Sequence, residues 1–330
     1  MSATYALAVI EEHGARPGLA GFIETLHGRI CEMAEALGVP DVDLTVVLTG
    51  DITASVRARS ETERDFTPER AGGTVRGKTI SLVRDFSETA IVLDTGGTEP
   101  GRDSDAVDFL HLLGHEYGHV LLGRLRASAG TRPPRTDRAK SPDEAAAIWA
   151  YEAADEFRCD LFSNLLLGAF AAATSDSCEP RPITLADLFG SGYRKAFVDL
   201  LDDVHPGWPD LVHAHRERRI EPDALYTGLI LATGSVLKLI AHADAVEEAG
   251  GNGPLLTASM DHPAVHQLLG PPWARIREVL DTTSLLPPLA EFAATDLAIQ
   301  DCGQYIVDMW EALGVTGHLT VDDEVCIFVC

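Results

Sequence analysis

The sequence predicts an α+β fold, with a compact domain in residues 1–175 and a mainly helical half in residues 176–330. Three observations lead to this prediction. Short apolar or β-branched segments bounded by turn residues occur in the first hundred residues, which favours a small sheet there. Apolar residues at helical spacing dominate most of the remaining chain. A polar stretch rich in Ser, Asp and Pro near residues 174–183 marks the expected boundary.

The individual elements follow from the same patterns. Residues 18–37 carry apolar side chains at helical spacing, and Gly38-Val39-Pro40 ends this helix. Pro142 suits the first turn of a helix, so a helix is expected to begin there. The expected strands are residues 44–48, 79–83, 90–93 and 319–329, and the expected long helices before the boundary are residues 106–125 and 142–173.

Charge and composition narrow the class of protein. Asp and Glu outnumber Lys and Arg by 51 to 26, which gives a formal net charge of -25. Such a chain repels phosphate backbones and anionic lipid surfaces, so neither nucleic acid nor a membrane is expected as a partner. The longest uncharged apolar stretch, residues 224–237, is too short to span a bilayer. The cysteines form no CxxC pair and no secretory signal is visible, so we expect a cytoplasmic protein.

Residues 115–119, His-Glu-Tyr-Gly-His, form an HExxH sequence within an apolar helical segment. His115 and His119 are four residues apart, so on a helix they project from one face and can bind one zinc ion through ring nitrogens. Glu116 follows His115 directly, where its carboxylate can reach a water molecule on the metal. Burying two histidines and a glutamate without a partner would be costly, so the apolar flanks favour a metal site.

The acidic residues of the next helix are candidates for a third ligand. A catalytic zinc ion needs three protein ligands and one open position. Glu152, Glu156 and Asp160 follow one another at four-residue intervals, so they share one face of the helix. We expect Glu156 to be the ligand and Asp160 to accept a hydrogen bond from a ligand histidine, which fixes the tautomer of the ring. Glu152 as the ligand, with Glu156 in the supporting role, is the alternative.

Residues 115–119 with their apolar flanks and the segment 156–162 (EFRCDLF) resemble the gluzincin metallopeptidases, the thermolysin-like clan. The likeness is greatest to compact ImmA/IrrE-type members, with a secondary likeness to Ste24/HtpX-type peptidases, and covers roughly residues 20–170. It implies a zincin-like domain, a small sheet plus the HExxH helix and the glutamate helix. The helical C-terminal half, which the likeness does not cover, is expected to complete the cleft. One departure is that the pattern of the compact members, aligned on residues 154–157, puts Tyr151 at the ligand position.

The same resemblance implies a reaction. The chain is expected to be a zinc-dependent metallopeptidase that binds one Zn2+ ion and hydrolyses peptide or protein substrates, with Glu116 as general base for a zinc-activated water. A strand at the cleft, residues 90–93, is expected to hold the substrate by strand addition. A Tyr or His beyond the glutamate helix is expected to stabilise the oxyanion, and the candidates are Tyr193, His205, His213, His215 and Tyr226.

Two other hypotheses come from different functional classes. In the first, the chain keeps the zincin scaffold as a regulatory or sensor protein that binds a specific partner with little general proteolysis, because half of the chain lies outside the resemblance. In the second, the motif is accidental in a structural helical protein. The sequence assigns no oligomeric state.

Overall fold

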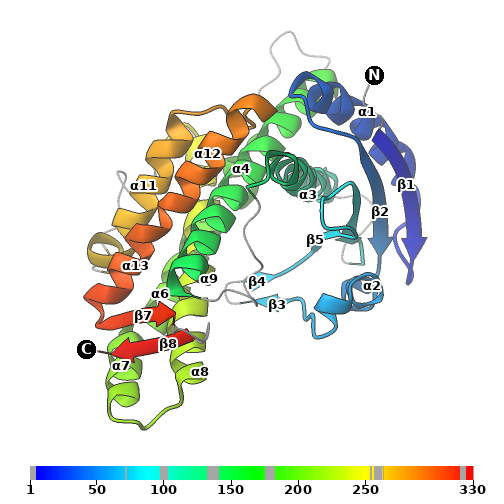
Figure 1. Ribbon diagram of the computed structural model, residues 1–330. Coiled ribbons are helices and arrows are strands. Elements are labelled where there is room, and N and C mark those ends of the chain that lie inside the picture. Colours follow the sequence, from blue (N-terminus) through cyan, green and yellow to red (C-terminus); the bar gives the residue numbers. More distant parts are fainter. Residues whose placement is uncertain are drawn as a thin grey trace. The chain divides into compact units, whose positions relative to one another are not determined.

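The computed structural model describes residues 5–70, 73–96, 103–131, 141–174, 183–252, 255, 262, 264–319 and 325–329. The protein is mixed α/β, with a small four-stranded sheet and a mostly helical remainder (Figure 1), which confirms the fold class in outline. The chain divides into two compact units, and helix α4 (Pro142–Thr174) runs through both. Unit 1 comprises Met1–Arg132, Arg158–Thr184 and Leu285–Ala293, and unit 2 comprises Pro133–Phe157, Leu185–Ser284 and Ala294–Cys330. The expected domain boundary at residues 175–176 lies outside the described residues.

Unit 1 is built on a sheet of strand order β1-β2-β6-β5. Three of its strands are parallel, namely β1 (Tyr5–Glu12), β2 (Val42–Thr49) and β6 (Glu88–Asp94), whereas β5 (Gly77–Ser81) runs antiparallel to β6 at the edge. The strands expected in residues 44–48, 79–83 and 90–93 are confirmed with shifted ends. Strand β1 was not expected, although its side chains alternate between half-buried and exposed positions as a strand should.

The two faces of this sheet pack on different helices because side chains alternate along each strand. On one face, Val46 and Leu93 belong to a large apolar core with helices α1 (Ala20–Ala36) and α3 (Asp103–Ala129). On the other face, Val47 and Val92 pack with Ile52 and Val56 of α2 (Ile52–Arg59). The inner strands β2 and β6 are therefore largely buried on both sides, as expected of inner parallel strands, whereas β1 at the edge has one exposed face. Three short elements complete this part of the chain: η1 (Glu61–Glu63), β3 (Glu69–Arg70) and β4 (Gly73–Thr74).

Helix α3 and the second half of α4 pack closely together in unit 1. A Cβ atom at Gly118 would lie 2.8 Å from Sγ of Cys159, and one at Gly114 would lie 3.2 Å from Cα of Ser163. A side chain at either position would force the neighbouring residues of α4 to shift, so glycine at both positions allows the close packing of the two helices. The expected helices at residues 106–125 and 142–173 are thus confirmed, and Gly118 of the HExxH sequence is one of the residues that bring them together.

Unit 2 is helical and contains the first half of α4. A Cβ atom at Gly234 would lie 2.5 Å from the ring of Trp149, and one at Gly303 would lie 2.6 Å from the backbone nitrogen of Ala147, so two helices approach α4 closely. The other elements are α5 (Leu185–Phe189), α6 (Gly192–Val204), η3 (His205–Gly207), α7 (Trp208–Arg216), α8 (Pro222–Leu225), the π-helix η4 (Tyr226–Leu231), α9 (Ala232–Ala249), the π-helix η5 (Val265–Leu269), α11 (Gly270–Asp281), α12 (Leu289–Asp301, whose first residues belong to unit 1) and α13 (Gly303–Ala312).

The C-terminal end differs from the expectation of one strand in residues 319–329. Two short strands occur there, β7 (Val315–Leu319) and β8 (Val325–Val329), and they pair antiparallel. A strand needs a partner for its backbone N–H and C=O groups, and an antiparallel hairpin supplies that partner locally.

One helical run, Pro222–Ala249, is long and apolar enough by composition to cross a membrane, and 56% of its most apolar window is buried inside the molecule. An internal helix of a globular unit has the same composition, so this run by itself is a weak indication of a membrane span. Within the described residues it is the one run with these properties, and a cytoplasmic location stays a prediction.

Candidate metal centre

Helix α3 presents the two histidines of the HExxH sequence on one face. The Nε2 atoms of His115 and His119 lie 3.0 Å apart, and the two ring centroids are separated by 4.8 Å. His115 is buried and His119 is partly buried. Because the residues are four apart on a continuous helix, this convergence follows from the helical repeat alone. The ring nitrogens of the two histidines therefore converge on one point, where they can form two sides of a binding site.

Asp160 of α4 holds the ring of His115 from the opposite side. Its Oδ1 atom lies 2.7 Å from Nδ1 of His115, and the carboxylate is 1% exposed. A carboxylate is an acceptor, so Nδ1 donates and Nε2 is left with a lone pair directed at His119. This is the tautomer that a metal ion requires of a histidine that binds through Nε2.

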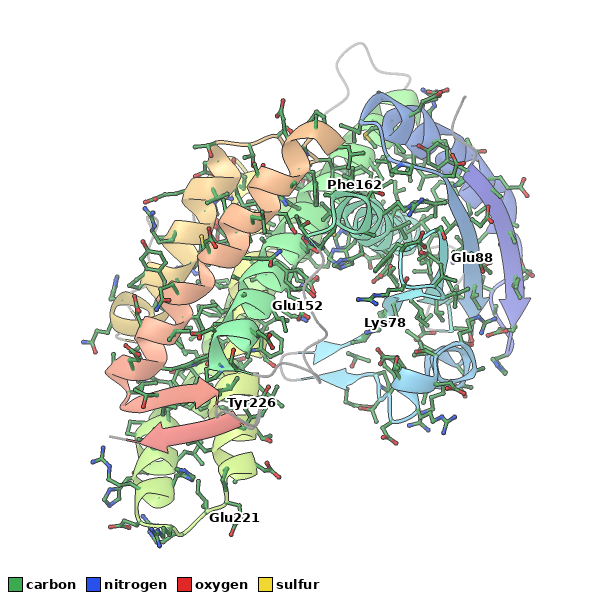
Figure 2. All side chains as sticks on the ribbon, in the orientation of Figure 1. Lys78, Glu88, Glu152, Phe162, Glu221 and Tyr226 are labelled. Atoms are coloured by element: carbon green, nitrogen blue, oxygen red, sulfur yellow. The ribbon has the colours of Figure 1, made fainter. Side chains whose placement is uncertain are left out.

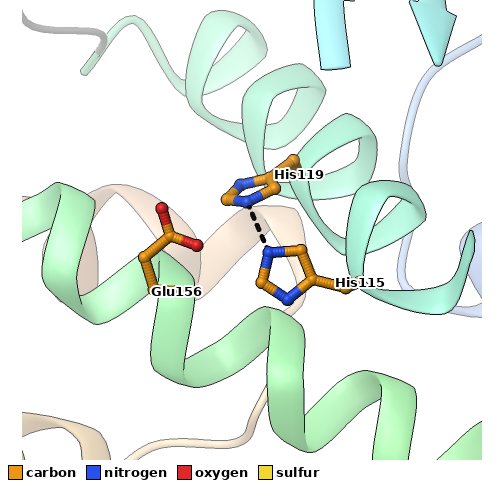
Figure 3. Close-up of side chains that lie close together, drawn as sticks. All are labelled: His115, His119 and Glu156. Carbon is orange, nitrogen blue, oxygen red and sulfur yellow. Dashed lines mark hydrogen bonds between the residues drawn. The ribbon is translucent and has the colours of Figure 1, made fainter. Parts of the chain in front are cut away.

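Glu156, one helical turn before Asp160, completes a group of three ligands (Figure 3). One ligand atom each of His115, His119 and Glu156 lies within 4.8 Å of the other two. Among the described residues this is the group of three or more His, Cys, Asp and Glu side chains close enough to hold a metal ion. Glu152, the alternative third ligand, is not a member. Its Oε2 atom forms an ion pair with Nζ of Lys238 at 2.7 Å.

The donor set fits a divalent cation of the zinc type. Two imidazoles and one carboxylate are typical ligands of zinc, and three protein ligands leave a fourth position open. Two ligand nitrogens around a tetrahedral zinc ion lie about 3.3 Å apart, since each bond is about 2.0–2.1 Å long. The 3.0 Å between the Nε2 atoms is close to that value. The structure thus brings together ligands that can hold a metal ion, without identifying the ion.

Glu116, which follows His115 on α3, is held in place by strand β5. The hydroxyl Oγ1 of Thr79 lies 2.7 Å from Oε2 of Glu116 and 3.0 Å from the backbone oxygen of the same residue. A Cβ atom at Gly77 would lie 2.7 Å from Oε1 of Glu116, so a side chain there would displace this carboxylate. Glu116 is 6% exposed. Its carboxylate is therefore fixed in position by a hydroxyl donor and by the close approach of the strand.

Tyr117, the residue after Glu116, anchors the same helix to α1. Its hydroxyl lies 3.0 Å from Nδ1 of His27, whose Nε2 atom lies 3.1 Å from the backbone oxygen of Tyr5. Since that oxygen can only accept, Nε2 of His27 donates and Nδ1 accepts from the phenol. Burial raises the pKa of Tyr117 well above its usual range, which keeps this phenol a hydrogen-bond donor. The contact fixes the register of α3 against the sheet.

The five residues expected as oxyanion donors lie in unit 2. Burial, and after it the nearby His262, lowers the pKa of His205. Burial raises the pKa of Tyr226, the first residue of η4, whose side chain is labelled in Figure 2. Both therefore remain uncharged donors near neutral pH. The exposed His213 forms an ion pair with Glu217 at 3.1 Å, and His215 follows on the same helix, α7.

Tyr193 is the candidate that contacts link to Glu156. Its ring stacks on that of His242, with 4.9 Å between the centroids and an interplanar angle of 17°. Nε2 of His242 lies 3.7 Å from Oε2 of Glu156. His242 was not expected from the sequence. The signal that was present is a pair of basic residues, Lys238 and His242, four apart on the otherwise apolar helix α9.

The strand expected to border the cleft, residues 90–93, cannot receive a substrate by strand addition. These residues belong to β6, which lies inside the sheet and is paired with β2 on one side and β5 on the other. Its backbone groups are already used by both neighbours. The expectation is therefore wrong, and the sheet edge beside Glu116 is β5, which carries Gly77 and Thr79.

Comparison with known proteins gives no family assignment. No protein-family model, no curated protein and no solved structure matches the chain. The geometry of α3, α4 and β5 is therefore the basis for assigning a function.

Proposed function

We propose that this protein is a zinc-dependent metallopeptidase of the zincin type. The observation that carries the proposal is the convergence of His115, His119 and Glu156, with Glu116 directly after His115 on α3 and bonded to Thr79. The three ligands would hold one Zn2+ ion, consistent with the gluzincin-like spacing of the HExxH sequence and the following glutamate. The class of substrate is a peptide or protein, and a cytoplasmic location is part of the same proposal.

The chemistry divides between the metal and the chain. A bound zinc ion lowers the pKa of a coordinated water to about 7 and polarises a carbonyl oxygen. Glu116 accepts the proton of the attacking water and delivers it to the leaving amine, the work of a general base and then of a general acid. Thr79 keeps the Glu116 carboxylate oriented, and Asp160 keeps His115 in the tautomer that has a lone pair on Nε2.

Hydrolysis by purified protein tests the proposal. Wild-type protein loaded with zinc and the Glu116→Gln variant are compared on a peptide library and on casein, with bound zinc measured in both. We expect both proteins to bind one zinc ion, and the variant to lose at least a hundredfold in kcat because an amide accepts no proton. Equal hydrolysis by both proteins, or none by either, would contradict the assignment.

A control variant separates loss of the base from general disturbance. Gln in place of Glu11, an exposed residue of β1, removes the same charge from the same unit. Its activity is expected to equal that of the wild type. A hydrolysis rate that falls equally in the two variants would indicate an unspecific effect of charge.

A further inference from the structure

Helices α4 and α9 of unit 2 meet along three successive turns, and each turn has a different kind of contact. Gly234 lies against the ring of Trp149, Lys238 pairs with Glu152, and His242 lies beside Glu156. From each contact to the next, the residue numbers rise by about one helical turn in both α4 and α9, so the two helices run parallel here. The close approach at Gly234 is what brings the longer side chains of the next two turns to the acidic face of α4.

Lys238 is fixed on Glu152 by more than one contact. Its Nζ atom lies 2.7 Å from Oε2 of Glu152, 5.9 Å from the centroid of the Trp149 ring, and 3.9 Å from Oε1 of Glu156. The side chains of Lys238 and Glu152 are 36% and 22% exposed. The short distance to Glu152 and the long one to Glu156 show which of the two carboxylates the lysine neutralises.

The two glutamates are chemically equivalent as metal ligands. They are four residues apart on one face of α4, so a change of side-chain rotamer brings the carboxylate of Glu152 one turn toward that of Glu156. A site with His115, His119, Glu156 and Glu152 all bound would have four protein ligands. Four ligands make the closed coordination of a structural zinc site, whereas a catalytic site keeps one position open.

We propose that Lys238 is a positioning residue that withholds Glu152 from the metal and so keeps the fourth coordination position open. This inference rests on the metal site of the proposed function. The ion pair satisfies the carboxylate of Glu152 with a cation on α9, so that Glu156 remains the acidic ligand. Lys238 acts through Glu152 and touches neither substrate nor metal.

Metal binding to three variants tests this inference without reference to activity. Lys238→Met removes the cation but keeps the length of the side chain. We expect zinc to bind about tenfold more tightly in competition with a chelator, because a fourth ligand is gained. We also expect the visible absorption spectrum of the Co2+-loaded variant to differ from that of the wild type, because a carboxylate takes the fourth coordination position in place of water. Lys238→Met combined with Glu152→Gln is expected to return both values to those of the wild type, and Lys238→Arg is expected to keep them.

The matched control is Lys195→Met, which removes an exposed lysine paired with Asp199 four residues on, also in unit 2. It is expected to leave zinc affinity and the Co2+ spectrum unchanged. Should Lys238→Met fail to fold, Lys238→Gln provides the same comparison.

Two outcomes would overturn the inference. One is a Lys238→Met protein with the zinc affinity and Co2+ spectrum of the wild type. The other is a change that Glu152→Gln does not reverse, since Glu152 then has no part in it. A wild type that binds metal but hydrolyses no peptide contradicts only the peptidase assignment, because the spectra still decide the role of Lys238. A wild type that binds no metal contradicts both.

Discussion

Oδ1 of Asp160 lies 2.7 Å from Nδ1 of His115, and both side chains are buried between α3 and the second half of α4. The contact joins a residue of the HExxH helix to one that stands four positions after Glu156. It orients the ring, fixes its tautomer and sets the spacing of the two helices that carry the metal ligands. The proposed metal site therefore depends on a residue that is not itself one of its ligands.

Asp160→Asn tests this dependence. The amide oxygen can still accept from Nδ1 of His115, but it carries no charge to strengthen the basicity of the ring. We expect the dissociation constant for zinc to rise about 10–100-fold, measured by competition with a fluorescent chelator. Ser163→Ala is the control, because Ser163 bonds to His111 on the same two helices. An unchanged zinc affinity in Asp160→Asn would show that the charge of Asp160 does not contribute to metal binding by His115.

Thr79→Val removes the hydroxyl that holds Glu116 and keeps the shape of the side chain. We expect kcat to fall about 10–100-fold, because the base loses its orientation, while bound zinc and KM stay near the wild-type values. Steady-state kinetics and metal analysis measure these quantities. The same exchange at Thr25, an exposed residue whose hydroxyl bonds only within α1, serves as the reference. A lower zinc content with an unchanged kcat would show that Thr79 supports the fold and does not orient the general base.

Gly118→Ala places a methyl group where Sγ of Cys159 lies at 2.8 Å. Because α3 and α4 would have to move apart, we expect the free energy of unfolding to fall by about 1–3 kcal/mol and zinc affinity to weaken with it. Denaturant titration and chelator competition follow the two effects. Gly28→Ala on the exposed side of α1, where nothing lies within 4 Å, should instead stabilise the protein by about 0.5–1 kcal/mol. Destabilisation of equal size at both positions would argue against close packing as the reason.

Whether a contact of the fold or of the candidate site could be predicted depended on how far apart its residues lie in the sequence. The HExxH pair, Glu156 and Asp160 were identified because each relationship is a four-residue repeat on one helix, which the sequence displays directly. Helices α3 and α4 were predicted for the same reason, since their apolar residues recur at helical spacing. The choice of Glu156 over Glu152 matches the group that the structure forms.

The contacts that the sequence did not predict are long-range. Thr79 lies 37 positions before Glu116, and Lys238 lies 86 positions after Glu152. No local pattern specifies which strand edge or which helix meets such a residue. Strand β1 was missed because its partner β2 lies more than thirty residues away across α1, and parallel pairing leaves no hairpin signal. The wrong prediction that residues 90–93 of β6 receive a substrate has the same origin, because the composition of strands does not specify their order in a sheet.

The ion pair of Glu12 and Arg59 predicts a pH dependence of stability. Hydrogen bonds from Arg59, at 2.8 and 3.0 Å, hold the pKa of Glu12 below its ordinary value of 4.5. A lowered folded-state pKa gives stability that is present above pH 4.5 and is lost as the pH falls through the folded-state pKa. We expect Glu12→Gln to cost about 1 kcal/mol at pH 7 and almost nothing near pH 2, in denaturant titrations at each pH. The control Glu11→Gln, at the neighbouring exposed residue, should show no such trend. A destabilisation by Glu12→Gln that grows as the pH falls would have the wrong sign and contradict the prediction.

Anomalous diffraction at the zinc edge, from crystals grown with one equivalent of zinc, locates the bound metal ion. We expect one peak about 2.0–2.2 Å from Nε2 of His115, Nε2 of His119 and a carboxylate oxygen of Glu156, with Glu152 still paired to Lys238. A zinc ion bound elsewhere, with the two rings joined only by their own hydrogen bond, would contradict it.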